Sequence, residues 1–151
     1  MNTELVTQKK ARTAATTIIV VEDDLYIGAL LVEAIRQETP YQAVLATQGT
    51  QALDLLRGIT PRLIILDYRL PDMNGIELYE RVHAVKTLEE VPVLLISAEI
   101  APDFKDVSAR NLPFLSKPFE LTNLFNEIEK LLASNDPSHR SINNGKSGLD
   151  S

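Results

Sequence analysis

The chain has 151 residues, of which 44% are hydrophobic and 24% are charged, and these values are typical of one soluble globular domain. The net charge is −6, and this excess of acidic residues repels phosphate backbones, so direct binding to DNA is not expected. The absence of cysteine excludes disulfides, cysteine-ligated metals and thiol catalysis.

The two ends of the chain are predicted to be disordered tails. Residues 1–17 and 134–151 hold too few apolar side chains to offset the entropy of ordering, which is about 1–2 kcal/mol per residue for the backbone. No apolar run has the length of a membrane span or a signal peptide, so we expect a cytoplasmic protein without membrane contact. The folded domain is predicted at residues 18–133, with too little chain outside it for an output domain.

Short apolar runs alternate with amphipathic stretches in the predicted domain. The run at 17–22 indicates a strand, and Asp24 is expected to cap the helix that follows at 25–37. The apolar stripe of that helix is Ile27, Leu30, Leu31, Ala34 and Ile35. Further strand and helix pairs are predicted at 41–46 and 50–58, at 62–67 and 74–87, at 91–97 and 102–110, and at 112–116 and 120–133.

The last two predicted helices differ in strength. The stripe of the helix at 120–133 is Leu121, Leu124, Ile128 and Leu131. The helix at 102–110 has only the apolar pair Phe104 and Val107, and Pro102 must lie at or before its first turn. We therefore expect this fourth helix to be short or irregular.

Three of the predicted strands are nearly continuous hydrophobic runs, which is typical of strands covered on both faces. Five such strands alternating with five helices predict a doubly wound α/β domain with a parallel five-stranded sheet. In this fold class ligands bind just beyond the carboxyl ends of the strands. The functional residues are therefore expected at those ends.

Polar side chains stand at the predicted strand ends. They are Glu22, Asp23 and Asp24 after the first strand, Asp67 after the third, Ser97 after the fourth and Lys117 after the fifth. Clustered carboxylates need a cation, and their oxygens together with waters suit Mg²⁺, while a lysine and a hydroxyl can hold phosphoryl oxygens. The alternative for any one position is a polar residue that only marks where a buried strand ends. No glycine-rich nucleotide motif is present.

Four motifs in this order carry a resemblance to a known family. They are Val20-Val21-Glu22-Asp23-Asp24, Asp67-Tyr68-Arg69-Leu70-Pro71-Asp72-Met73-Asn74-Gly75, Ile96-Ser97-Ala98 and Lys117-Pro118-Phe119. With these motifs, residues 18–133 resemble the receiver domain of two-component response regulators. The resemblance implies a flavodoxin-like sheet with strand order 2-1-3-4-5.

The resemblance implies that Asp67 accepts a phosphoryl group from a phosphohistidine of a sensor histidine kinase or a phosphotransfer protein. Asp23 and Asp67 would ligate Mg²⁺ directly, Glu22 would act mainly through water, and the backbone carbonyl of Arg69 would be a further ligand. Lys117 would pair with the phosphoryl oxygens. The metal and the lysine would neutralise the transferring group, so that a carboxylate can attack it in line.

The resemblance also implies a conformational switch. The Ser97 hydroxyl would bind the phosphoryl oxygens, and Phe114 would then rotate inward and change the surface of the fourth helix, fifth strand and fifth helix. The alternative for Phe114 is a core aromatic with one fixed rotamer. Arg110-Asn111 replace the usual Gly-Ala before the fifth strand, which makes this output surface atypical.

Further positions carry separate predictions. We expect Arg69 and Glu99 to pair across the mouth of the site and slow autodephosphorylation, with an effect on stability of at most about 1 kcal/mol. The Lys117-Pro118 bond resembles one that is cis in the family, with a helix-start proline as the alternative. His83 is expected on a solvated helix face.

The sequence thus predicts a phosphoacceptor signalling domain, which assists its own phosphorylation and slow autodephosphorylation but is not an enzyme. It would signal to an unknown downstream protein and could form a homodimer. One alternative is a receiver-like interaction scaffold that is never phosphorylated. A less favoured one is an aspartate-nucleophile phosphatase, a family that places a second Asp where this chain has Arg69.

Overall fold

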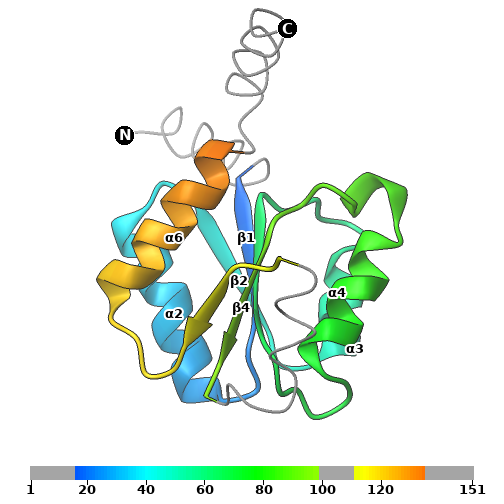
Figure 1. Cartoon of the computed structure of the whole chain (residues 1–151), viewed down its shortest axis with the longest axis horizontal. Helices are drawn as coiled ribbons and strands as arrows, with labels where there is room; N and C mark the ends of the chain where they lie inside the picture. Colours follow the sequence, from blue (N-terminus) through cyan, green and yellow to red (C-terminus); the bar gives the residue numbers. More distant parts are fainter. Residues whose placement is uncertain (1–15, 99–110, 135–151) are drawn as a thin grey trace, which may run out of the picture.

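The computed structural model describes residues 16–98 and 111–134, which form a five-stranded parallel sheet between two pairs of helices (Figure 1). The strands are β1 (Thr17–Val21), β2 (Gln42–Ala46), β3 (Leu63–Asp67), β4 (Val93–Ser97) and β5 (Phe114–Ser116). Their order in the sheet is β2-β1-β3-β4-β5, and all neighbouring strands are parallel. The predicted doubly wound α/β fold and its strand order are confirmed.

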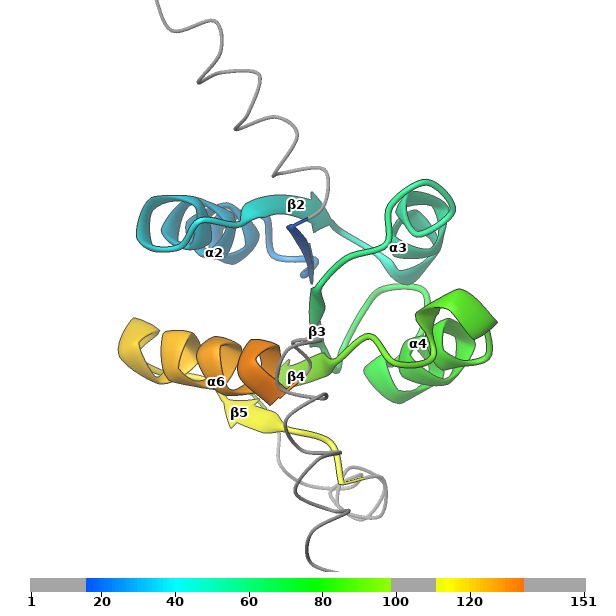
Figure 2. The ribbon, with the colours of Figure 1, turned by 90° about the horizontal axis from the view of Figure 1, so that it is seen from above.

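In the described part of the chain, two helices cover each face of the sheet. The helices are α2 (Leu25–Glu38), α3 (Gly49–Leu55), α4 (Gly75–His83) and α6 (Leu121–Ser134), with a short 3₁₀ helix η1 (Lys86–Leu88) after α4. Seen from above, α2 and α6 lie on one side of the sheet and α3 and α4 on the other (Figure 2). The helix predicted at 102–110 falls outside the described residues. Within the described residues, no helix is both long enough and apolar enough to cross a membrane.

Several elements are shorter than the sequence patterns predicted. α3 ends at Leu55, because the chain turns over residues 56–58 and Gly58 is a poor helix former. α4 ends at His83, because Val85 has an extended backbone, with φ −87° and ψ 122°, which suits a β-branched side chain. β5 begins only after Pro113, which has no N–H for the ladder.

Consecutive residues of the central strands point to opposite faces of the sheet, as the period of two requires. In β3, Leu63 and Ile65 pack with side chains of α2 and α6, in what we term the α2/α6 core. Ile64 and Leu66 pack with side chains of α3 and α4, in the α3/α4 core. All four side chains are at most 1% exposed. The sheet therefore separates two apolar layers.

The buried face of α2 is rotated relative to the predicted stripe. Leu31 is 2% exposed, as predicted, but Leu30, assigned to the same stripe, is 52% exposed. Gly28 lies on the buried face instead, where a Cβ atom would be 2.7 Å from a methyl group of Leu45. The predicted stripe therefore included Leu31, Ala34 and Ile35 of this face but omitted Gly28 and Val32.

The buried stripe of α6 also differs from the prediction. Leu124, Ile128 and Leu132, spaced by four residues, are at most 5% exposed. Leu121 is 37% exposed and Leu131 is only partly buried, so these two predicted members lie at the edge of the stripe. Leu124 and Ile128 are therefore confirmed as members of the buried stripe, and Leu132 takes the place predicted for Leu131.

Candidate functional site

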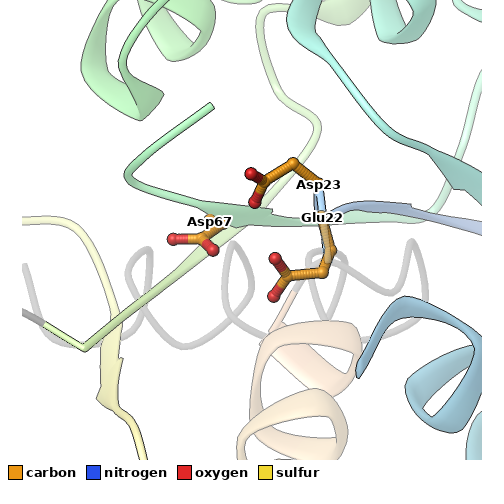
Figure 3. A group of neighbouring side chains, drawn as sticks. All are labelled: Glu22, Asp23 and Asp67. Atoms are coloured by element: carbon orange, nitrogen blue, oxygen red, sulfur yellow. The ribbon is translucent and has the colours of Figure 1, made fainter. Parts of the chain in front are cut away.

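Three acidic side chains meet at the carboxyl ends of β1 and β3 (Figure 3). Glu22 and Asp23 follow β1 directly, and Asp67 ends β3, the neighbouring strand whose Leu66 is paired with Val21. Carboxylate oxygens of the three acids lie within 4.8 Å of one another. Glu22 and Asp67 are buried, whereas Asp23 is exposed. The structure thus brings these three predicted residues together.

Lys117 completes the cluster from the end of β5. Its ammonium nitrogen Nζ donates hydrogen bonds to Glu22 Oε1 at 2.6 Å and to Asp67 Oδ2 at 2.9 Å. Its main-chain N–H donates to the Ser97 carbonyl at 2.8 Å, which continues the pairing of β4 with β5. Glu22, Asp67 and Lys117 continue the alternate positions of their strands that face the α2/α6 core. This shared face lets the three side chains meet.

Burial dominates the electrostatics of the cluster. It raises the pKa of Glu22 from its ordinary 4.5 to about 7, although the hydrogen bond from Lys117 lowers that pKa and Asp67 raises it further. Burial also lowers the pKa of Lys117, but the hydrogen bonds to Glu22 and Asp67 outweigh this effect and raise the pKa above its ordinary 10.5. The ammonium therefore stays charged among carboxylates that outnumber it.

The second oxygen of each buried carboxylate accepts a main-chain hydrogen bond. Asp24 N–H donates to Glu22 Oε2, and Arg69 N–H donates to Asp67 Oδ1, both at 3.2 Å. The Asp24 side chain is the predicted cap of α2, since its Oδ1 accepts the Tyr26 N–H at 3.0 Å. Both buried carboxylates are therefore held at each of their oxygens.

These residues fit a divalent cation with oxygen ligands. When all three carboxylates are ionised, the Lys117 ammonium offsets one of their three negative charges, as far as the described residues show. Such a deficit favours a bound cation. Mg²⁺ prefers oxygen ligands and keeps several waters, which the exposed side of the cluster at Asp23 can admit.

The loop between β3 and α4, which carries Arg69, turns back tightly on itself. Gly75 N–H donates to the Tyr68 carbonyl at 2.6 Å, and Asn74 Oδ1 caps α4 by accepting the Glu77 N–H at 2.8 Å. A Cβ atom at Gly75 would lie 2.9 Å from the Cα atom of Tyr68. This close backbone approach requires glycine.

Asp72, in the same loop, makes contacts that the sequence analysis did not predict. Its Oδ1 and Oδ2 accept the main-chain N–H groups of Gly49 and Thr50, the first residues of α3, both at 2.8 Å. Burial alone raises the pKa of Asp72, but these hydrogen bonds outweigh it and hold the pKa below 3.8. Gln48, at the N-cap of α3, makes no side-chain cap bond. The signal that could have indicated these contacts is that α3 has no capping side chain of its own.

Ser97, Phe114 and Pro118 lie in β4, in β5 and just after β5. Ser97 ends β4, is 1% exposed and is paired in register with Ser116. Phe114, at the start of β5, is partly buried against the α3/α4 core. The Lys117-Pro118 bond is cis, as predicted. The switching roles of Ser97 and Phe114 stay predictions.

Two further predictions have different outcomes. Glu99 lies outside the described residues, so its pairing with the exposed Arg69 stays a prediction. The predicted solvated position of His83 was wrong, because the ring is half-buried with Nε2 2.8 Å from the Val91 carbonyl oxygen. The ring also contacts Tyr79, with centroids 4.4 Å apart. The bond to Val91 spans eight residues, so helical spacing could not reveal it.

Comparisons with known proteins agree with this geometry. The family model described as response regulator receiver domain matches residues 18–129. Sporulation initiation phosphotransferase F of Bacillus subtilis (strain 168) is 31% identical over 119 residues, which cover 76% of this chain and 92% of that protein. The response regulator receiver protein CpdR of Brucella abortus (strain 2308) is 31% identical over 115 residues, which cover 76% of this chain and 95% of that protein.

A solved structure extends the comparison to three dimensions. The response regulator protein TrrA of Thermotoga maritima, solved in complex with Mg(2+)-BeF, matches with a TM-score of 0.69 and 27% identity. The match covers 78% of this chain and 99% of that one. Other relatives are longer, and the chain spans only 7% to 49% of their length.

Proposed function

The chain belongs to the family of response regulator receiver domains, and on this premise we propose that it accepts a phosphoryl group on Asp67 in a Mg²⁺-dependent reaction. The group would come from a phosphohistidine on a sensor histidine kinase or a phosphotransfer protein. The observation that carries the proposal is the convergence of Glu22, Asp23 and Asp67, with the Lys117 ammonium 2.9 Å from Asp67 Oδ2.

In the proposed step, a carboxylate oxygen of Asp67 attacks the phosphorus atom in line. A P–O bond forms, the P–N bond breaks, and its electron pair returns to the imidazole nitrogen, so that an acyl phosphate remains on Asp67. Lys117 and the Arg69 N–H, each bonded to one oxygen of Asp67, orient the nucleophile. The Lys117 ammonium is then close enough to pair with the phosphoryl oxygens.

Four groups of this chain would hold Mg²⁺: the carboxylates of Asp23 and Asp67 directly, Glu22 through water, and the backbone carbonyl of Arg69. When bound, Mg²⁺ supplies positive charge that offsets the charge on the transferring phosphoryl group. The Mg(2+)-BeF complex of the relative TrrA supports this assignment.

The exposed apolar side chains of α2 support a protein as the phosphodonor. Leu25, Tyr26 and Leu30 are 67%, 81% and 52% exposed, and the helix begins two residues after Asp23. Apolar groups that gather on a surface often mark a site of protein interaction. The proposed donor covers these three side chains while its phosphohistidine reaches Asp67.

The proposed output is a change at the far edge of the sheet. Ser97 would bind the phosphoryl oxygens, and Phe114 would move inward against the α3/α4 core. A downstream protein, whose identity stays open, or a second copy of this chain would recognise the altered surface. Arg69 and Glu99 would slow hydrolysis of the acyl phosphate. This autodephosphorylation is the only turnover that we propose for the chain.

The remaining assignments have support from composition alone. A domain at 18–133 with tails at 1–17 and 134–151, and a place in the cytoplasm, stay predictions. Partners are proposed to be proteins and not DNA, because the net charge of −6 opposes contact with phosphate backbones.

Intact-mass measurement with Mg²⁺ and acetyl phosphate as a small phosphodonor tests the proposed function. The chain is expected to gain one phosphoryl group, and Asp67→Asn is expected to gain none. Asp54→Asn is the matched control, since Asp54 is an exposed acid on α3 and should leave the gain unchanged.

Two other outcomes of the same experiment point to the alternatives. No gain of mass in the unaltered chain would favour a receiver-like scaffold. Continuous release of phosphate over many turnovers would favour an aspartate-nucleophile phosphatase.

A further inference from the structure

Asp72 links the loop between β3 and α4 to the start of helix α3. The two carboxylate oxygens of Asp72 accept the N–H groups of Gly49 and Thr50, each at 2.8 Å. Gly49 and Thr50 open α3, which follows the edge strand β2. These bonds join residues that are 22 and 23 positions apart in the sequence.

Met73 strengthens the same attachment through packing. Its side chain is 9% exposed and belongs to the α3/α4 core. A Cβ atom at Gly49 would lie 2.6 Å from the Met73 sulfur, so the thioether lies directly against the backbone at the start of α3. We refer to the contacts of Asp72 and Met73 with Gly49 and Thr50 as the loop clamp.

The loop clamp lies on one side of Arg69, and the sheet holds the other side. Tyr68 N–H donates to the Ile96 carbonyl at 2.9 Å, which continues the pairing of β3 with β4. Only Arg69, Leu70 and Pro71 lie between this bond and Asp72. The proposed metal ligand, the Arg69 carbonyl, is therefore in a short span that is fixed at both ends.

We propose that Asp72 is a positioning residue for the divalent cation, because the loop clamp holds the Arg69 carbonyl where the cation needs it. The inference rests on the proposed function, since it takes the Arg69 carbonyl as a ligand. Residues that orient metal ligands without touching the metal commonly change affinity by about 10- to 100-fold when they are replaced. Asp72 acts through a backbone span, so its effect belongs at the lower end of that range.

A Mg²⁺ titration followed by ¹H–¹⁵N NMR tests this role without any phosphodonor. Asp72→Ala is expected to weaken Mg²⁺ binding about tenfold, and Asp72→Asn, which keeps one acceptor oxygen, is expected to weaken it less. At saturating Mg²⁺, acetyl phosphate should phosphorylate Asp72→Ala at the rate of the unaltered chain. A loss confined to Mg²⁺ affinity separates positioning from general damage to the site.

The matched control is Thr39→Ala. Thr39 Oγ1 donates to the Ile35 carbonyl at 2.6 Å and accepts the Tyr41 N–H at 3.2 Å, so this variant also loses two hydrogen bonds. It lies at the C-terminal end of α2, away from the proposed site. Mg²⁺ affinity should be unchanged in this variant.

Thermodynamic linkage gives a second, reciprocal readout. If the loop clamp favours Mg²⁺ binding, then Mg²⁺ must favour the loop clamp by a similar factor. Hydrogen exchange of the Gly49 and Thr50 amides should therefore slow on addition of Mg²⁺ more than exchange at Ile35, in the buried part of α2.

The proposal is overturned if Asp72→Ala weakens Mg²⁺ binding no more than Thr39→Ala does, or if Mg²⁺ slows exchange equally at the three amides. Should Asp72→Ala not fold, the same comparison is made with Asp72→Asn. Failure of the proposed function looks different, since the unaltered chain would then bind Mg²⁺ with the expected dependence on Asp72 and gain no phosphoryl group.

Discussion

Glu22 has the least favourable position of the three acids, because its side chain is 1% exposed and lies beside a second carboxylate. Burial, with a further contribution from Asp67, raises its pKa to about 7 despite the hydrogen bond from Lys117. The folded protein therefore retains a proton on Glu22 at pH values where the unfolded chain, with an ordinary value of 4.5, has lost it.

The pH dependence of folding follows from this difference. A raised folded-state pKa contributes stability that is fully present below pH 4.5 and is lost as the pH rises through about 7. In metal-free buffer the free energy of unfolding should fall by roughly 3 kcal/mol over this range from Glu22 alone. Urea unfolding of the unaltered chain and of Glu22→Gln at several pH values measures this fall in the free energy of unfolding. Parallel curves for the two proteins would contradict the prediction.

At the residue scale, the sequence predicted which residues form the site better than it predicted their hydrogen-bond partners. Glu22, Asp67 and Lys117 could be predicted to converge, because polar residues after buried parallel strands share one edge of the sheet. Asp72 and His83 could not be assigned, since their partners are main-chain groups of other segments. Side-chain hydrogen bonds to the backbone of a separate segment leave no local sequence pattern, unlike the helix cap at Asp24.

Among the elements, α2 was predicted with nearly correct bounds but with a partly wrong buried face. The predicted bounds, 25–37, are close to the observed Leu25–Glu38. The predicted stripe treated Leu30 and Leu31 alike, yet the first is 52% exposed and the second is 2% exposed. Adjacent positions of this helix can both be buried, as Leu31 and Val32 are, so the apolar pattern did not decide which neighbour of Leu31 faces the core, and the buried Gly28 carries no apolar signal.

These two leucines make a matched pair for stability. Leu31→Ala should lower the free energy of unfolding by about 2–5 kcal/mol, because it leaves a cavity in the α2/α6 core. Leu30→Ala should change it by about 0.5 kcal/mol or less, because most of the side chain is already in water. Chemical denaturation of the two variants measures both values. Equal losses would show that the assigned face is incorrect.

The exposed side of α2 gives a kinetic prediction. Tyr26→Ala should slow phosphoryl transfer from a phosphohistidine protein about tenfold, since aromatic side chains often dominate protein interfaces. Transfer from acetyl phosphate should be unaffected, because a small donor needs no docking surface. Val85→Ala, at an exposed apolar position after α4, is the control. A Tyr26→Ala variant that is slowed equally with both donors would argue against docking on α2.

Strand positions were easier to predict than helix faces and ends. β1, β3 and β4 are buried at every position, so their continuous apolar runs were clear in the sequence. The ends of α3 and α4 depend on single turns, which local composition describes poorly. The helix predicted at 102–110 and Arg110, the first residue of the atypical Arg110-Asn111 pair, are outside the described residues.

For the molecule as a whole, the proposed binding of a cation at the acidic cluster would be linked to folding. The acidic cluster joins β1 and β3, and Lys117 adds β5, so three strands converge on one set of charges. The unfolded chain cannot assemble these groups. A cation that binds there therefore stabilises the folded state by mass action.

Mg²⁺ should accordingly raise the unfolding free energy by about 2.7 kcal/mol at 100 times its dissociation constant. Calorimetry with and without Mg²⁺ measures the effect, and EDTA should reverse it. Asp23→Asn removes an exposed carboxylate of the cluster and should reduce the gain while leaving the metal-free protein folded. A full gain in Asp23→Asn would show that the cation binds elsewhere.

The alternation of side chains between the two apolar layers limits how this fold can vary. Asp67 is four positions after Leu63, and that even interval keeps the acid on the side reached by Lys117. Deletion of a single residue inside β3 would reverse the alternation and turn Asp67 toward α4. The strands before Glu22, Asp67 and Lys117 must therefore keep an even interval between their core-facing residues and the charged residue.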